Sequence, residues 1–343
     1  MKSNVLYTFE GNDVIEYTLK NKYLEIRALN YGASIRMIKV KNSQGIQENV
    51  VVDYDDVASY FKCPAPYMNA IVAPSAGRIA YGKYKIDAKQ YTLSLNSPPN
   101  HLHGGKSGVS KAFFNVEEIS ENQKQILRFT LEKDHHEDGY NGVYTYKIDY
   151  ILEHNTFTIH AVCTPKKRGI ANLTSHLYFN LSGDLKDSIN THELKIPATK
   201  KTKIHNDNYP YKIEDIKKNS AFDFTSYKTI LQNYAKGSEE FEITKGYDCA
   251  FLLNEGNTIS LYDKESGRKL DVSTNQNSVV VYSANYFDSK LVLNNKQKGY
   301  PFCCIALETQ DIPNAINILG QEDRLYDESH PFVQTTTYTF TTK

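Results

Sequence analysis

The chain has 343 residues, and its 40 lysines and arginines are balanced by 40 aspartates and glutamates, so the formal net charge is zero. Charged residues make up 23% and hydrophobic residues 40%, which is ordinary usage for a globular protein and excludes global disorder. Nucleic-acid binders need clustered Lys and Arg, so this neutral balance argues against a nucleic-acid partner and favours a small, weakly charged ligand.

The N-terminal residues show no apolar segment followed by a small-residue cleavage site, and no apolar run approaches the ~20 residues of a membrane helix. The five cysteines are scattered, with no CxxC and no Cys/His ligand spacing; they are Cys63, Cys163, Cys249, Cys303 and Cys304. We therefore predict a cytoplasmic protein with reduced thiols, no metal and no membrane partner.

Apolar and polar residues alternate with period two along most of the chain. The pattern begins with Leu24, Ile26 and Ala28, and further β-rich runs lie at 127–131, 144–152, 157–163, 278–287, 301–310 and 333–342. Such runs predict half-buried strands. The KESGR segment at 264–268, between two such runs, is typical of a hairpin turn.

Helical patterning is limited to a turn or two around Asp55–Phe61 and a short segment near Tyr227–Tyr234. Without regular βαβ alternation, Rossmann and TIM folds are disfavoured. Residues 203–225 are the most loop-like, and we interpret them as a long loop rather than a domain boundary. With no linker, repeat or change in composition, we predict one domain over residues 1–343, an all-β protein built as a large antiparallel β-sandwich.

Three histidines lie in unusual surroundings. His101 and His103 precede a Gly-Gly pair that lets the backbone approach a ligand, and on an extended chain both imidazoles would point the same way. A metal pair is the weaker interpretation because no third ligand of matching type lies nearby. His176 lies in the apolar run NLTSHLYFNLSG and needs a hydrogen-bond partner or a role. For each of the first two, a structural histidine is the plain alternative.

Charged side chains interrupt three other segments. Arg78 follows Gly77 and offers a planar fork of donors for vicinal hydroxyls or a carboxylate, although an arginine at a strand edge is more often paired with a surface acid. Glu308 ends a strongly apolar strand, where an unpaired carboxylate is costly to bury, so we expect a site residue with a raised pKa. Asp248 in GYDCAFLL is a similar, weaker case.

Together and in this order, these segments resemble the aldose 1-epimerase (galactose mutarotase) family. The matching segments are YGASIRMIKV (31–40), APYMNAIVAPSAGRIAYGKY (65–84), NHLHGGKSG (100–108), NLTSHLYFNLSG (172–183), GYDCAFLL (246–253) and LETQD (307–311). The resemblance spans nearly the whole chain, and LHGG and HLYFNLSG are its most specific parts. It implies a β-sandwich of the supersandwich type, an open sugar cleft and no cofactor.

The resemblance also implies roles for individual residues. His176 matches the catalytic histidine of the family, the general acid, and Glu308 matches the general base. The positions that match sugar-binding residues are Arg78, His103 and Asp248. His101 is not the family match, and we treat it as incidental.

The chain departs from the family pattern at three places. Gly77 replaces the asparagine of a common Asn-Arg pair, and Phe113-Phe114 stands where a tryptophan follows the LHGG segment. After Gln310 the chain reads DIPNAINILG instead of a histidine and a proline-rich loop. These differences bear on which sugar is preferred rather than on the chemistry.

The implied reaction interconverts the α and β anomers of aldohexoses such as galactose and glucose. It needs one base and one acid, which we expect on opposite sides of the sugar, each contributing roughly 10²–10⁴-fold. An ionised Glu308 near His176 would raise the pKa of the imidazole and increase its protonated fraction. After ring opening the two groups exchange roles. We expect a sugar as the only partner and a monomer or homodimer.

Three rival interpretations remain open. A glycosidase would use two carboxylates, which Asp248 and Glu308 could supply, but it would not explain the histidine in the most specific motif. A non-catalytic carbohydrate-binding sandwich would make the same sugar contacts without turnover. A hexose-6-phosphate epimerase would need a cationic pocket, which the zero net charge neither shows nor excludes.

Overall fold

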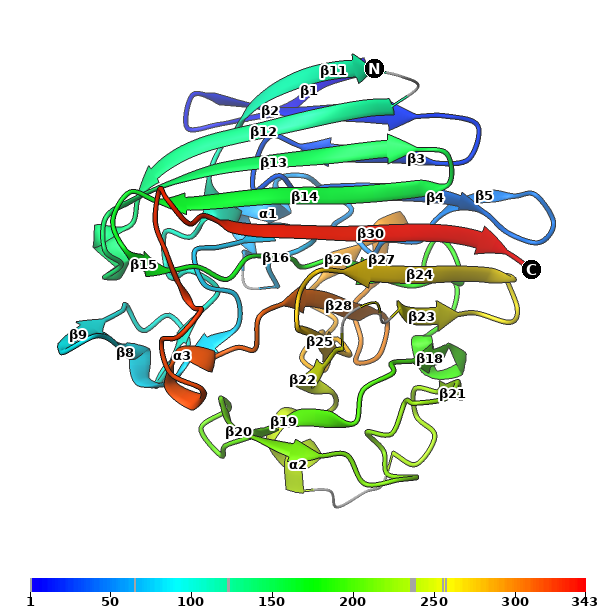
Figure 1. The fold of residues 1–343 in the computed structure, drawn as a ribbon. Helices are drawn as coiled ribbons and strands as arrows, with labels where there is room; N and C mark the ends of the chain where they lie inside the picture. Colours follow the sequence, from blue (N-terminus) through cyan, green and yellow to red (C-terminus); the bar gives the residue numbers. More distant parts are fainter. Residues whose placement is uncertain (1, 65, 122–123, 235–238, 255, 257) are drawn as a thin grey trace.

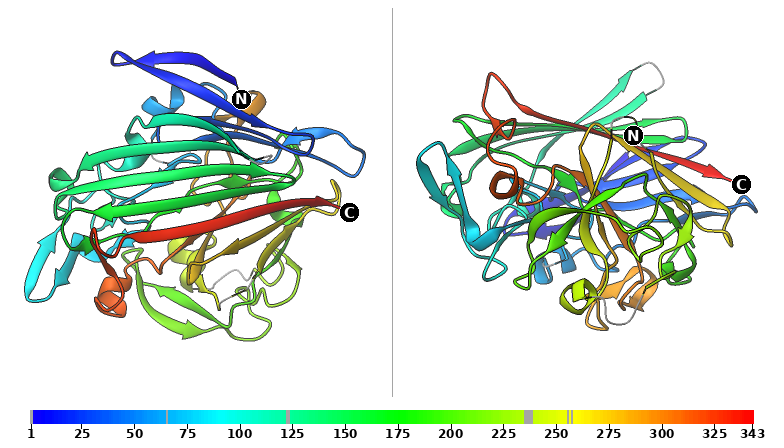
Figure 2. Two further views of the ribbon diagram at one scale, coloured as in Figure 1. Left: turned by 45° about the horizontal axis from the view of Figure 1, so that its top comes forward. Right: turned by 60° about the horizontal axis from the view of Figure 1, so that its bottom comes forward.

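The largest element of the computed structural model is a nine-stranded antiparallel sheet (Figure 1); the structure describes residues 2–64, 66–121, 124–234, 239–254, 256 and 258–343. In spatial order its strands are β11 (Asn115–Glu121), β12 (Lys124–Asp134), β13 (Val143–Glu153), β14 (Thr156–Pro165), β30 (Phe332–Thr342), β24 (Arg268–Thr274), β23 (Thr258–Tyr262), β18 (Glu193–Lys195) and β21 (Lys228–Thr229). The late strand β30 lies between β14 and β24 (Figure 2), so distant parts of the chain share this sheet.

Across the described ranges, two further sheets complete the framework. The six-stranded sheet consists of β17 (Tyr178–Phe179), β28 (Ile305–Gln310), β25 (Ser278–Tyr282), β22 (Asp248–Leu252), β19 (Lys200–Ile204) and β20 (Pro210–Asp215). The five-stranded sheet consists of β1 (Lys2–Phe9), β2 (Asn12–Lys20), β3 (Glu25–Leu29), β4 (Ile35–Lys41) and β5 (Gln47–Asn49).

Small antiparallel pairs and short helices connect these sheets. The pairs are β6 (Ile71–Val72) with β16 (Thr174–Ser175), β7 (Arg78–Ile79) with β10 (His101–Leu102), β8 (Lys83–Ile86) with β9 (Lys89–Thr92), β15 (Gly169–Ile170) with β29 (Leu325–Tyr326), and β26 (Val292–Leu293) with β27 (Gln297–Lys298). The α-helices are α1 (Ser59–Lys62), α2 (Glu239–Thr244) and α3 (Ala315–Ile318). Within the described ranges, no helix has the length and apolar character to span a bilayer.

The main core lies between the nine-stranded and six-stranded sheets. Alternate residues of β14 are buried, as the period-two pattern predicted. Tyr338 of β30 stacks on Phe157 of β14, with ring centroids 5.9 Å apart, and also contacts Phe179 of β17 at 5.7 Å. Strand β28 is different, because all six of its residues are buried. It packs on the core with one face and borders the cleft described below with the other.

The all-β prediction is confirmed, and so is the hairpin, because β23 pairs with β24 across the KESGR turn. Helix α1 (Ser59–Lys62) overlaps the range expected near residues 55–61. The helix expected near Tyr227–Tyr234 is wrong: Lys228 and Thr229 form β21, which extends the sheet by pairing with β18. Residues 203–225 are not one long loop, since they contain β20.

All five cysteines are free. Cys303 and Cys304 are fully buried in the core.

Candidate active site

A cleft of about 380 Å³ opens on one face of the six-stranded sheet. In this sheet Asp248 pairs with Tyr282, and Val280 pairs with Glu308. Residues two apart on a strand share a face, so the register brings Asp248, Tyr282 and Glu308 to the same side of three neighbouring strands. All three line the cleft, which places the predicted Asp248 and Glu308 together.

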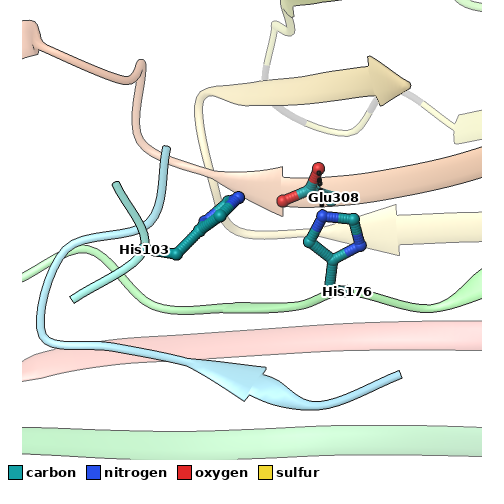
Figure 3. Close-up of side chains that lie close together, drawn as sticks. All are labelled: His103, His176 and Glu308. Atoms are coloured by element: carbon teal, nitrogen blue, oxygen red, sulfur yellow. Dashed lines mark ion pairs between the residues drawn. The ribbon is translucent and has the colours of Figure 1, made fainter. Parts of the chain in front are cut away.

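His176 lies against Glu308, with Nε2 of the imidazole 3.4 Å from Oε1 of the carboxyl group (Figure 3). It follows β16, and its backbone N–H donates to the carbonyl of Ala70 at 2.9 Å. The hydroxyl of Thr174 in β16 donates to the carbonyl of Thr309 in β28 at 3.0 Å. These bonds hold the histidine segment against the strand that carries the carboxyl group. Both side chains are nearly inaccessible, although both line the cleft.

The expectation that the acid and base lie on opposite sides of a sugar is wrong, because 3.4 Å leaves no room for a pyranose between them. The chemistry does not need such separation. The anomeric oxygen and the ring oxygen are bonded to the same carbon, so two groups that reach these atoms must themselves be neighbours. The observed pair therefore suits proton exchange at one carbon centre.

Burial shifts the pKa values of Glu308 and His176 in opposite directions. The pKa of Glu308 is raised, as expected, whereas the pKa of His176 is lowered, contrary to the expectation. Desolvation, with a further contribution from the Asp248 charge, raises the pKa of Glu308 to about 8, against the opposing effects of Arg78 and Gln310. Desolvation lowers the pKa of His176 to about 4. The prediction that Glu308 raises the pKa of the imidazole is therefore wrong, because a buried carboxyl group that keeps its proton offers no charge.

His103 reaches the same cleft from a sharp turn after β10. Its backbone φ is +49°, and a Cβ at the next residue, Gly104, would lie 2.0 Å from the carbonyl oxygen of Ala73, so only glycine fits there. The Gly77 N–H donates to Nδ1 of His103 at 3.1 Å. Burial, followed by the charges of His176 and Arg78, keeps the pKa of His103 well below its usual range. The ring is therefore neutral with its proton on Nε2, which makes that nitrogen a donor.

His101 does not share this position. Its Nδ1 lies 2.8 Å from the carbonyl of Ser94 and its Nε2 lies 2.7 Å from the hydroxyl of Tyr140, in the buried interior. The expectation that His101 and His103 point the same way is wrong because the chain leaves the extended conformation at His103. The contacts of His101 agree with its interpretation as incidental to the site.

Arg78 and Asp248 form an ion pair at the cleft wall. Nη1 of the guanidinium lies 3.2 Å from Oδ2 of the carboxylate, and both residues line the cleft. Among the hydrogen bonds of the described residues, none reaches Nε of Arg78, although that atom is buried. The arginine is thus paired with an acid of the cleft rather than with one on the outer surface.

Three side chains of the cleft are close enough to be considered as metal ligands. One potential ligand atom from each of His103, His176 and Glu308 lies within 4.8 Å of the others. The tautomer of His103 opposes this interpretation. Nδ1 already accepts the Gly77 N–H, so the nitrogen left for a metal is Nε2, which carries the proton. The arrangement favours hydrogen bonds to a polar ligand.

Two of the departures from the family pattern meet in space. A Cβ at Gly77, whose φ is +71°, would lie 2.5 Å from Cβ of Pro313, a residue of the segment that follows Gln310. Pro313 therefore occupies the space that a side chain at position 77 would need. The third departure lies elsewhere, since neither Phe113 nor Phe114 is among the residues that line the cleft.

Several residues of the cleft were not singled out from the sequence, among them Tyr67, Tyr282 and Gln310. Tyr67 packs against His103 with ring centroids 4.6 Å apart, and no periodic pattern marks it. Tyr282 and Gln310 could have been found, because each lies two residues from a cleft-facing position on a predicted strand. His176 and Glu308 are buried together and can exchange one proton, and groups that bind hydroxyls lie beside them. This arrangement defines an acid–base enzyme for a small polar substrate.

Comparison with known proteins narrows this class. A family model described as aldose 1-epimerase matches residues 16–326. Galactose mutarotase of Homo sapiens is 30% identical over 316 residues, which cover 90% of this chain and 88% of that protein. Aldose 1-epimerase of Haemophilus influenzae is 28% identical over 320 residues, which cover 90% of this chain and 91% of that protein. The crystal structure of galactose 1-epimerase from Lactobacillus acidophilus superposes with a TM-score of 0.87 at 25% identity, covering 99% of both chains.

The chain belongs to the aldose 1-epimerase family. The family resemblance predicted from the sequence, and with it an isomerase of this family, is confirmed.

Proposed function

We propose that the protein interconverts the α and β anomers of aldohexoses such as galactose and glucose by opening and closing the sugar ring. The observation that carries this proposal is the contact of 3.4 Å between His176 and Glu308 in a cleft with its own hydroxyl-binding groups. The similarity to galactose mutarotase and galactose 1-epimerase supports the choice of sugar.

In this proposal Glu308 takes the proton of the anomeric hydroxyl and His176 gives a proton to the ring oxygen. Rotation about the C1–C2 bond follows, and the same two groups then reverse their roles to close the ring. Between pH ~4 and ~8 the pair holds one proton, and the order of the pKa values puts it on Glu308 in the free protein. The reaction therefore requires that this proton moves to His176 when sugar binds, over the 3.4 Å between them.

The remaining cleft groups would bind and orient the ring. Arg78 offers its guanidinium group, His103 offers Nε2–H, and Asp248 accepts from a hydroxyl while its charge is balanced by the arginine. This set of donors and acceptors matches vicinal hydroxyls and requires no charge on the ligand. Asp248 as the second carboxylate of a glycosidase fits less well, because it is already committed to Arg78.

Polarimetry of freshly dissolved α-D-galactose and α-D-glucose tests the proposal directly. We expect the purified protein to accelerate mutarotation of at least one of them well above the spontaneous rate. Binding without acceleration would contradict catalysis, and hydrolysis of a nitrophenyl glycoside would favour a glycosidase. A strong preference for hexose 6-phosphates over free hexoses would replace the proposed substrate with a phosphorylated one.

The proposal includes the other expectations from the sequence. These are a single domain over residues 1–343, a cytoplasmic location, no cofactor, no nucleic-acid partner, and a monomer or homodimer. The shared nine-stranded sheet, which joins strands from residue 115 to residue 342, supports the single domain. Cooperative unfolding in one thermal transition and a sedimentation experiment would test the domain and the oligomeric state.

A further inference from the structure

Gln310 lies beside Glu308 at the end of β28, two residues further along the strand and on the same face. Its side-chain Nε2 donates to Oε2 of Glu308 at 3.3 Å. The other carboxyl oxygen, Oε1, lies 3.4 Å from Nε2 of His176. Each oxygen of the carboxyl group therefore has its own neighbour, and the two contacts together fix the plane of the group.

The amide of Gln310 is itself held in one orientation by Asn172. Nδ2 of Asn172 donates to Oε1 of Gln310 at 3.4 Å and to the carbonyl of Asp311 at 2.9 Å, while Oδ1 accepts the N–H of Asp311 at 2.9 Å. With Oε1 of Gln310 used as the acceptor from Asn172, its NH₂ group is the part that faces Glu308. Gln310 is completely buried, so water does not compete for these contacts.

Asn172 also connects this pair to the opposite wall of the cleft. Its backbone N–H donates to the carbonyl of Pro74 at 2.7 Å, and its carbonyl accepts the N–H of Ala76 at 2.6 Å. Residues 74–76 lead directly into Gly77 and Arg78. The placement of Glu308 is thus fixed relative to the segment that holds His103 and carries the guanidinium.

We propose that Gln310 is a positioning residue for the reaction: held by Asn172, it keeps the carboxyl group of Glu308 oriented toward His176 and stabilises its ionised form. This inference rests on the proposed function of the His176–Glu308 pair. It goes beyond that function because it assigns a task to a residue that exchanges no proton with the sugar.

The electrostatic surroundings of Glu308 show why such a donor matters. Burial and Asp248 oppose ionisation of Glu308, whereas Arg78 and the Gln310 amide favour it, and the balance leaves its pKa at about 8. The titratable groups around Glu308, or coupled to it, are Arg78, His103, His176, Tyr178, Asp248, Tyr282 and Tyr338. A neutral amide that donates to the carboxylate lowers the cost of ionisation without adding a charge to the cleft.

The test compares Gln310→Met with a matched control, Gln334→Met. Gln334 is also a buried glutamine, but its Nε2 donates to the carbonyl of Thr309, not to Glu308. Loss of the Gln310 donor should raise the pKa of Glu308, so the alkaline limb of kcat/KM should move up by about one pH unit. The rate at the plateau should fall about tenfold, because less of the pair carries its proton on His176. The control should lose stability without moving the limb.

Three outcomes would overturn the inference. If the alkaline limb of kcat/KM stays in place in Gln310→Met while the rate falls, Gln310 has only a structural role. If KM alone increases, Gln310 contacts the sugar directly. Equal shifts in both variants would remove its specific role. If Gln310→Met does not fold, Gln310→Glu, which keeps the shape and removes the NH₂ donor, should move the limb in the same direction, and a limb that stays in place would have the same meaning.

A readout that does not depend on activity separates this inference from the proposed function. The carboxyl carbon of Glu308 can be titrated by ¹³C NMR in protein labelled at glutamate, with Glu308→Gln to assign the resonance. The titration midpoint should be higher in Gln310→Met than in the parent protein and unchanged in Gln334→Met. An inactive parent protein would contradict the proposed function alone, whereas an unchanged midpoint would contradict the inference alone.

Discussion

The nine-stranded sheet and the cleft face of the six-stranded sheet are built differently and have different roles. In the long strands of the first, such as β14, buried and partly exposed residues alternate, and the strands are held by long, regular registers. The cleft is built from shorter strands and from turns with positive φ, including those at Tyr67, Gly77 and His103. Stability and chemistry are thus assigned to separate regions, and substitutions in each should have separate consequences.

The largest effects are expected on catalysis. His176→Asn and Glu308→Gln should each reduce kcat for mutarotation by about 10²–10⁴-fold, because each removes one partner of the proton exchange. Each replacement is polar and no larger than the residue that it replaces, so both variants should remain folded. Polarimetric rates like those of the parent protein in either variant would reject the assigned roles.

The next largest effect is expected on stability. Tyr338→Ala removes the ring that packs on Phe157 and Phe179 between the two sheets, and should cost about 3–5 kcal/mol of unfolding free energy. Thr337→Ala, at the neighbouring and partly exposed position, should cost under about 1 kcal/mol. Denaturant unfolding measures both. A large loss of kcat per folded molecule in Tyr338→Ala would show that the two regions are not separate.

A third prediction concerns the pH dependence of stability, to which the cleft residue Glu308 contributes. The pKa of Glu308 rises from 4.5 to about 8 in the folded protein, so the folded state binds more protons than the unfolded chain in this interval. The stabilising contribution of Glu308 is therefore lost as pH increases from about 4.5 to about 8, by a few kcal/mol, and the loss levels off above that range.

Glu308→Gln removes this dependence. The difference in thermal midpoint, variant minus parent, should increase across the same interval and then stay constant. A difference that is independent of pH would mean that the carboxyl group ionises as freely in the cleft as in water.

The smallest effect tests the contact between the two departures from the family pattern. Gly77→Ala places a methyl group against Pro313 and strains a backbone with φ of +71°, so we expect a loss of about 1–3 kcal/mol and a weaker hold on His103. The double variant Gly77→Ala with Pro313→Gly, which removes the Cβ and Cγ atoms of residue 313, should recover part of the loss. Additive costs in the double variant would show that the proline is not the obstacle.

The sequence predicted the strands in which burial of one face alone decides the pattern of residues. Strands β13, β14 and β30 bury one face, so apolar and polar residues alternate and the strands can be identified from the sequence. Glu308 was identified because a carboxyl group in an apolar strand is costly. The family resemblance supplied the roles of the other candidates, and the structure gathers Arg78, His103, His176, Asp248 and Glu308 around one cleft.

What could not be predicted depends on contacts between distant segments. The direction of His103 is decided by a turn whose shape depends on Ala73 and Gly77. The pKa of His176 depends on how completely the fold excludes water, which no local pattern records. Strand β21 forms because β18 offers an edge, although its own sequence suggested a helix.

The position of β30 has a consequence for biosynthesis. Both of its neighbours, β14 and β24, leave the ribosome well before it does, and until β30 arrives each presents an open edge with unpaired amides and carbonyls. Open edges of this kind recruit other strands, including those of neighbouring nascent molecules. The nine-stranded sheet is therefore complete only after translation of residue 342, and the edges of β14 and β24 are exposed to such pairing until then.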